Sequence, residues 1–191
     1  MHGASTYPNP TTLWDLRAHS GRVALVEDGR LVAYDELADL SDRIAQAVPQ
    51  SRSLVFCLCS NTVGSVAAYL GFMNHGTVPL LLDVGIERDL LGDLIERYCP
   101  SYLWVPDAQV ESFAGMGDLF SCEGHRLLAT GLGPAPLLSD QLALLMSTSG
   151  STGSPKLVRL SAANVRSNTD SIVEYLRIKP DDRAITSLQM S

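Results

Sequence analysis

Several features are scarce in this sequence, and each scarcity makes certain classes of partner or site less expected. Charged residues make up 18% of the 191 residues, the formal net charge is -7, and no run of Lys and Arg forms a basic stripe. Such a stripe is what draws nucleic acid or anionic lipid to a protein surface. We therefore expect this protein to bind neither nucleic acid nor anionic lipid. An anionic ligand would have to be held locally, by backbone N–H groups and one or two placed cations.

Long apolar runs are also missing. Apolar runs such as LALLM at 142–146 are far too short to span a bilayer. The first ten residues, MHGASTYPNP, contain neither the basic nor the apolar segment of a signal peptide. The sequence therefore predicts no membrane span, and a cytoplasmic location is the default expectation.

Cysteines are few, and their spacing does not favour a metal site. Cys57 and Cys59 alternate with apolar residues in a strand-like run, so a metal or redox pair and two small core side chains are the alternatives. Cys99 and Cys122 add no second pair at metal-ligand spacing. We favour burial in the core, where free cysteines are common, and predict no metal ligand.

Histidines and tryptophans are isolated as well. His19, His75 and His125 have no partner at ligand or triad spacing, and surface or loop positions are the prediction for them. Trp14 and Trp104 are predicted to pack in a core rather than to stack on a nucleotide base.

Hydrophobic residues make up 46% of the chain, which is enough for a sizeable core. Asp28-Gly29 predicts a tight hairpin turn. Helical and strand-like patterns then alternate. The predicted elements are a helix at 35–48, a strand at 53–60, a helix from 63, a strand at 77–83, a helix at 89–98 and a strand at 101–105. This alternation predicts an α/β fold with a parallel-rich sheet flanked by helices.

The pattern loosens between 106 and 136, where we place a connection between two lobes. Residues 1–135 form the first predicted lobe, and residues 136–191 begin a second one. The second lobe is predicted to contain strands at 141–146 and 156–161, a helix at 162–177 and a terminal strand at 184–190.

An unbroken run of Ser, Thr and Gly at 147–154, followed by Pro155 and Lys156, is the most informative stretch. Such runs are usually flexible linkers. This one lies between two predicted strands, so we interpret it as a loop within one domain. Its glycines let backbone N–H groups converge, its hydroxyls donate hydrogen bonds, and Lys156 adds a compact charge, which together suit a polyphosphate. It is not a Walker A loop, because Lys156 follows Pro155 and leads into a strand.

Three stretches resemble the adenylate-forming superfamily, which comprises acyl- and aryl-CoA synthetases, nonribosomal peptide synthetase adenylation domains and luciferases. STSGSTGSPK (147–156) resembles the phosphate-binding loop of that family. VAYDELADLSDRIAQAV (32–48) looks like its early Tyr-x-Glu-Leu helix, and residues 53–83 are similar to the strand and helix that follow. The resemblance implies the N-terminal portion of the adenylate-forming fold, with an incomplete second lobe.

The resemblance also implies a reaction. A carboxylic acid would react with ATP to give an acyl-adenylate and pyrophosphate, and the acyl group would pass to a thiol of CoA or of a carrier protein. Mg²⁺ would bridge the phosphates, and Lys156 would be the catalytic charge. The implied phosphate-binding residues are Thr148, Ser149, Gly150, Ser151, Thr152, Gly153 and Lys156. The alternative, from another class, is a non-catalytic binding or assembly module that keeps the fold.

The sequence departs from the family pattern at two places. Leu157 replaces the Gly that usually follows the loop lysine, and Ala162 and Ala163 precede Asn164 where a His is frequent. Neither change removes a phosphate ligand. Because of both changes, the sequence does not assign the chain to one subfamily.

The resemblance places the substrate pocket, the adenine and ribose contacts and a C-terminal lid after Ser191. We therefore expect an N-terminal fragment that does not adenylate by itself. The apolar segment 184–190 would lack its covering elements, so a homodimer of the fragment is a further expectation.

Overall fold

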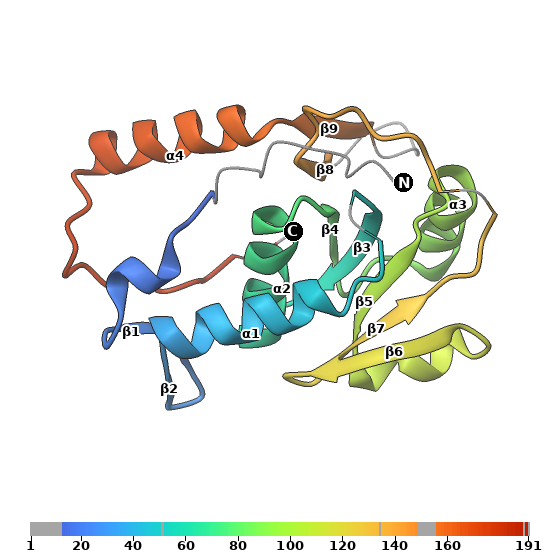
Figure 1. The fold of residues 1–191 in the computed structure, drawn as a ribbon, viewed down its shortest axis with the longest axis horizontal. Helices are drawn as coiled ribbons and strands as arrows, with labels where there is room; N and C mark the ends of the chain where they lie inside the picture. Colours follow the sequence, from blue (N-terminus) through green and yellow to red (C-terminus); the bar gives the residue numbers. More distant parts are fainter. Residues whose placement is uncertain (1–12, 51, 134, 149–155, 189, 191) are drawn as a thin grey trace, which may run out of the picture.

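The computed structural model describes residues 13–50, 52–133, 135–148, 156–188 and 190, and its main feature is a mixed seven-stranded sheet (Figure 1). The strand order is β6-β7-β5-β3-β4-β8-β9, with β3, β4, β5 and β8 parallel to one another and the other strands antiparallel to their neighbours. The strands are β3 (Leu54–Cys59), β4 (Val78–Asp83), β5 (Tyr102–Pro106), β6 (Gly117–Cys122), β7 (His125–Ala129), β8 (Leu144–Thr148) and β9 (Lys156–Leu160). The predicted α/β class is confirmed.

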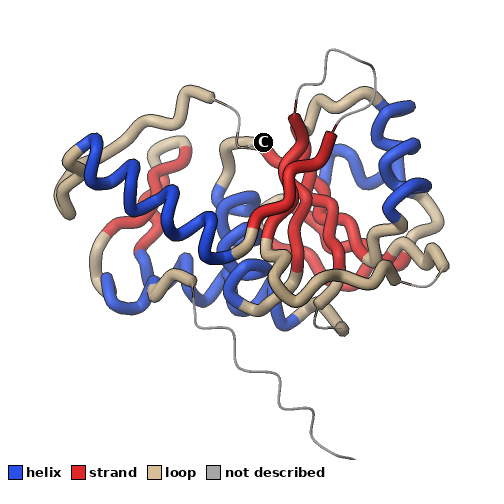
Figure 2. The backbone as a smooth tube through the Cα atoms, turned by 90° about the horizontal axis from the view of Figure 1, so that it is seen from above, coloured by secondary structure: helices blue, strands red, loops and turns tan. Residues whose placement is uncertain are grey.

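Helices lie on both sides of this sheet (Figure 2). On one face, α1 (Tyr34–Gln46) and α2 (Val63–Asn74) form a core cluster with alternate residues of β3. On the other face, the remaining residues of β3 pack against α3 (Arg88–Tyr98) and the 3-10 helix η2 (Asp107–Phe113). Every residue of β3 is buried, which explains why its sequence is continuously apolar rather than alternating.

A small hairpin precedes the sheet and confirms the predicted turn. A 3-10 helix, η1 (Leu16–His19), leads into β1 (Val23–Glu27) and β2 (Arg30–Ala33), which pair antiparallel. The two turn residues, Asp28 and Gly29, both have positive φ, as a type I′ turn requires.

The segment 106–136, where we placed a connection between two lobes, is not irregular, because it contains η2 and the β6–β7 hairpin. β7 pairs antiparallel with β5, so the hairpin extends the sheet. The turn residues Glu123 and Gly124 have φ values of 49° and 68°, which again fit a type I′ turn. The Glu-Gly pair was the available sequence signal.

The terminal strand predicted at 184–190 is also corrected. Residues 184–188 are not in a strand, and Ile185 and Leu188 are 93% and 80% exposed. An apolar extended segment becomes a strand only by pairing with another one. Among the described residues, this segment has no strand neighbour.

The last helix, α4 (Ala162–Leu176), agrees with its predicted range. β8 and β9, which the sequence assigned to a second lobe, join the same sheet as β4. The division at residue 135 stays a prediction.

α1 and α2 pack with unusually close backbones. Gly71 lies against Ser41, and a side-chain carbon at Gly71 would overlap the carbonyl group of Ser41. Only glycine permits this approach.

His125 is buried rather than at the surface, contrary to prediction. It is 2% exposed, and its ring stacks on Trp104 with 5.5 Å between ring centroids and 4° between ring planes. Nδ1 donates to the carbonyl oxygen of Glu123 at 2.9 Å, so in the neutral ring Nε2 accepts from the Ser65 hydroxyl at 3.4 Å. Trp104 is fully buried, as predicted.

We expect His125 to make stability depend on pH. Burial lowers the pKa of His125, and the carboxylates of Asp107, Glu27 and Glu123 only partly oppose this. In the unfolded chain, histidine has a pKa of about 6.5. Below that pH the unfolded chain therefore binds a proton at His125 more readily than the folded protein does. The free energy of unfolding should therefore be highest above pH ~6.5 and fall below it by up to about 1.4 kcal/mol per pH unit.

Urea unfolding between pH 8 and pH 5 measures this slope. His125→Gln should flatten it, whereas His19→Gln, at an exposed residue, should leave it unchanged. Equal slopes in the parent and His125→Gln would show that other groups cause the dependence.

Cys57 and Cys59 are each 1% exposed and belong to the core, as predicted. Burial raises the pKa of the Cys59 thiol to about 12, so the thiolate is not formed near neutral pH. Within the described residues, no group of three or more His, Cys, Asp or Glu side chains could hold a metal ion.

Candidate functional site

The candidate phosphate loop is carried by the β8–β9 hairpin. The two strands pair in antiparallel register from Leu144 opposite Leu160 to Thr148 opposite Lys156. Directly opposed residues of such a pair have Cα atoms about 5 Å apart. The structure therefore brings together the two ends of the predicted phosphate-binding set.

The middle of the set lies outside the described residues. It consists of Ser149, Gly150, Ser151, Thr152 and Gly153. Thr148 is the last residue of β8. Its place at the end of β8 still fixes where the loop leaves the sheet.

The hairpin ends at the edge of the sheet where ligands bind in α/β folds. β8 runs parallel to β4, with Met146 opposite Leu81, so the loop starts at the carboxyl ends of both strands. The neighbouring strands β3 and β4 lead into α2 and α3, which lie on opposite faces. In open α/β sheets, ligands bind at the carboxyl ends of the strands where such a change of face occurs.

Lys156 is exposed, at the first position of β9. Side chains alternate along a strand, and the next residue, Leu157, packs in the core on the α3 side of the sheet. Lys156 therefore belongs to the opposite face, which Leu160 shares by packing on the α2 side. The departure from Gly at position 157 has a structural role, because Leu157 extends the core.

The exit from β9 is fixed by a capping box at the start of α4. The Ser161 hydroxyl accepts from the backbone N–H of Asn164 at 3.1 Å, and the Asn164 side chain accepts from the backbone N–H of Ser161 at 3.0 Å. This reciprocal pair satisfies backbone donors that the helix leaves open. It holds the junction that directly follows the strand of Lys156.

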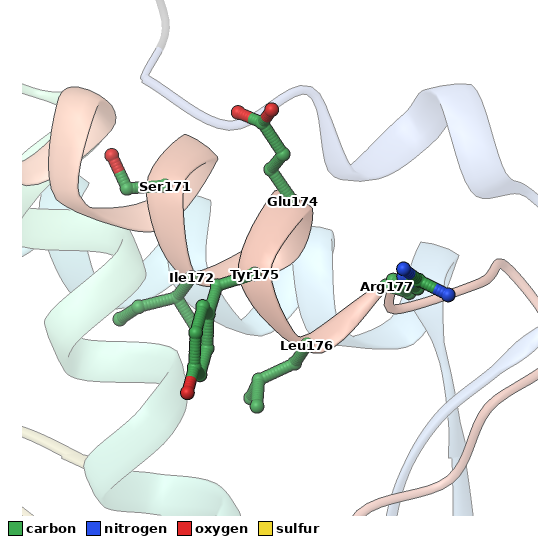
Figure 3. Close-up of a pocket in the computed structure, with 6 residues that line it drawn as sticks. All are labelled: Ser171, Ile172, Glu174, Tyr175, Leu176 and Arg177. Carbon is green, nitrogen blue, oxygen red and sulfur yellow. The ribbon is translucent and has the colours of Figure 1, made fainter.

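A hollow of about 950 Å³ does not coincide with this hairpin. Its lining residues come from the last turns of α4 and its C-cap Arg177, as Figure 3 shows, with Tyr175 and Leu176 on one side and Glu174 on another. Tyr175 is 86% exposed. A hollow along one exposed helix brings no groups together from a second element, so we assign it no chemistry.

No helix among the described residues is long and apolar enough to cross a membrane. Comparison with known families gives a match over most of the chain. The family described as AMP-binding enzyme matches residues 13–191, which is nearly the whole chain. This chain belongs to the AMP-binding enzyme family. The match includes the β8–β9 hairpin and every helix and strand described above.

Curated relatives of this AMP-binding enzyme are large synthetases. Malformin synthetase mlfA of Aspergillus brasiliensis is 28% identical over 180 residues, which cover 88% of this chain and 4% of that protein. The hybrid PKS-NRPS synthetase pynA of Aspergillus niger is 28% identical over 169 residues, covering 82% and 4%. The chain thus spans a small fraction of the length of the curated relatives it matches.

Solved structures share the fold of this AMP-binding enzyme. The O-succinylbenzoate coenzyme A synthetase MenE of Bacillus subtilis, in complex with ATP and magnesium ion, superimposes with a TM-score of 0.69 at 20% identity. The match covers 94% of this chain and 50% of MenE. Apo MatB of Rhodopseudomonas palustris gives a TM-score of 0.68 at 22% identity, covering 87% and 36%.

Proposed function

We propose that this chain is the N-terminal part of an ATP-dependent carboxylate-adenylating ligase. A carboxylate oxygen of the substrate attacks the α-phosphorus of ATP, and the bond from that phosphorus to the bridging oxygen breaks. The products are an acyl-adenylate and pyrophosphate. The observation that carries the proposal is the position of Lys156 opposite Thr148, at the base of the Ser/Thr/Gly loop of an AMP-binding enzyme.

In this proposal the loop stabilises charge on the leaving pyrophosphate. Lys156 supplies a positive charge, and Thr148 and residues 149–153 supply hydroxyl and backbone N–H donors. Preorganised donors of this kind act where charge develops in the transition state. Mg²⁺, when bound, would neutralise the phosphates, and it would be held mainly by phosphate oxygens and water, as is usual for this ion.

The second half-reaction would transfer the acyl group to a thiol. The names of the relatives support two acceptors, since MenE is a coenzyme A synthetase and pynA is a hybrid PKS-NRPS synthetase. We propose CoA or a carrier protein as the acceptor. Adding each thiol to a preformed acyl-adenylate and detecting the thioester distinguishes the two.

Exchange of labelled pyrophosphate into ATP tests the adenylation step. We expect the full-length protein to catalyse exchange only when a cognate acid is present, across a panel of aliphatic, aromatic, amino and keto acids. Exchange that is independent of any acid would contradict the proposal. So would the absence of both exchange and AMP release with every acid of the panel.

A further inference from the structure

A second hollow, of about 550 Å³, lies between α3 and η2. Its volume is within the range typical of sites for small molecules. Unlike the hollow along α4, it is lined by two helices and by the connection between β4 and α3. The lining residues are Val84, Ile86, Arg88, Leu91, Gly92, Ile95, Ala108, Gln109, Ser112 and Phe113.

Gly92 is the unexplained residue of this pocket. It lies in the interior of α3, where glycine destabilises a helix by about 1 kcal/mol relative to alanine. Its φ is not positive, and no atom lies within 4 Å of the place where a side-chain carbon would be. Gly71 differs, because close helix packing excludes a side chain there. Neither the backbone conformation nor the packing at Gly92 requires a glycine. The absence of a side chain at this position leaves space in the pocket that a larger residue would fill.

The polar groups of the pocket are few and come from both helices. The Arg88 guanidinium donates to the Ser112 hydroxyl at 3.2 Å, which joins the start of α3 to η2. The Gln109 amide donates to the carbonyl oxygen of Val84 at 2.8 Å and ties η2 to the residue that follows β4. Among the described residues that line the pocket, Arg88 is the one cation. In the described part of the chain it forms no ion pair with a carboxylate, so its positive charge can bind an anionic ligand.

We propose that this pocket binds a small monocarboxylate with a short apolar chain. The carboxylate would accept from Arg88 and Ser112, and the chain would lie over Gly92 against Leu91, Ile95 and Phe113. A charge-assisted hydrogen bond to Arg favours a carboxylate over an uncharged group.

The neighbourhood of Arg88 favours a single negative charge. Glu87 and Asp89 flank Arg88 in sequence and are exposed, so they repel a dianion such as phosphate more than a monocarboxylate. The pocket lies on the α3 side of the sheet, whereas Lys156 belongs to the other face. The inference therefore does not depend on the proposed adenylation.

Equilibrium dialysis of the full-length protein against labelled octanoate, without ATP, tests the pocket. Octanol should bind at least about 10-fold more weakly than octanoate, and Arg88→Gln should weaken octanoate binding by a similar factor. Arg97→Gln is the matched control, because Arg97 lies at the other end of α3, over the Tyr98 ring and outside the pocket lining.

Substitutions at Gly92 test the position of the chain. Gly92→Leu should abolish octanoate binding by filling the pocket, while Gly92→Ala should retain it. The proposal is overturned if octanoate does not bind at millimolar concentration, if octanol binds equally well, or if Arg88→Gln and Arg97→Gln behave alike. Since Arg88 is exposed, the Arg88→Gln comparison remains decisive even if Gly92→Leu fails to fold.

Discussion

Lys156→Ala should slow acyl-adenylate formation by the full-length protein about 10²- to 10³-fold, the usual effect of removing one preorganised donor from a transition state. The alanine removes the charge that would offset the developing negative charge of pyrophosphate. Because Lys156 is exposed, at the first position of β9, the fold should tolerate the change. Pyrophosphate exchange at saturating acid, combined with a thermal melt, separates the chemical effect from unfolding.

The chain offers a matched control, because Lys179 is its only other lysine. Lys179 is also exposed and follows α4, away from the hairpin. Lys179→Ala should leave the exchange rate unchanged. Equal rates in Lys156→Ala and the parent protein would remove Lys156 from the mechanism.

Gly71→Val should lower the free energy of unfolding by about 3 kcal/mol, at the upper end of what overpacking usually costs. The valine side chain would overlap the carbonyl group of Ser41 and force α1 and α2 apart. The obstacle is backbone, which cannot rotate away as a flexible side chain could. Urea unfolding monitored by circular dichroism measures the change.

Gly92→Ala is the comparison for this variant, because both glycines lie inside helices. Nothing occupies the space at Gly92, so alanine there should stabilise the protein by up to about 1 kcal/mol. Similar losses of stability in Gly71→Val and Gly92→Ala would mean that helix packing is not what distinguishes these positions.

Elements with a strong local pattern were predictable. β3 is buried on both faces and is continuously apolar, and α1 has one buried stripe, so sequence periodicity alone located them. β6 was missed because it is a largely exposed strand whose sequence alternates weakly. Its pairing is set by β7, which in turn pairs with β5 on its other side.

Burial imposed by distant partners was not predictable either. His125 is enclosed by Trp104 and Ser65, which its own neighbours in sequence do not reveal. For the candidate site, loop composition predicted Thr148 and Lys156, which the structure places opposite each other. Their role in binding phosphate stays a prediction. The pocket beside α3 needs residues of two helices to converge, and the only local sign of it was Gly92 within a helical pattern.

The position of β8 in the sheet affects synthesis of the chain. β8 covers the open side of β4 through Leu80 and Leu81, although it is made long after β3, β4 and β5 have emerged. Domains begin to fold from the N-terminus while the ribosome is still translating. Until residue 148 leaves the ribosome, β4 is therefore an apolar edge strand that other nascent chains can pair with. Pairing of β8 with β4 closes that edge, so the strand that leads to the candidate loop would also protect the growing chain from aggregation.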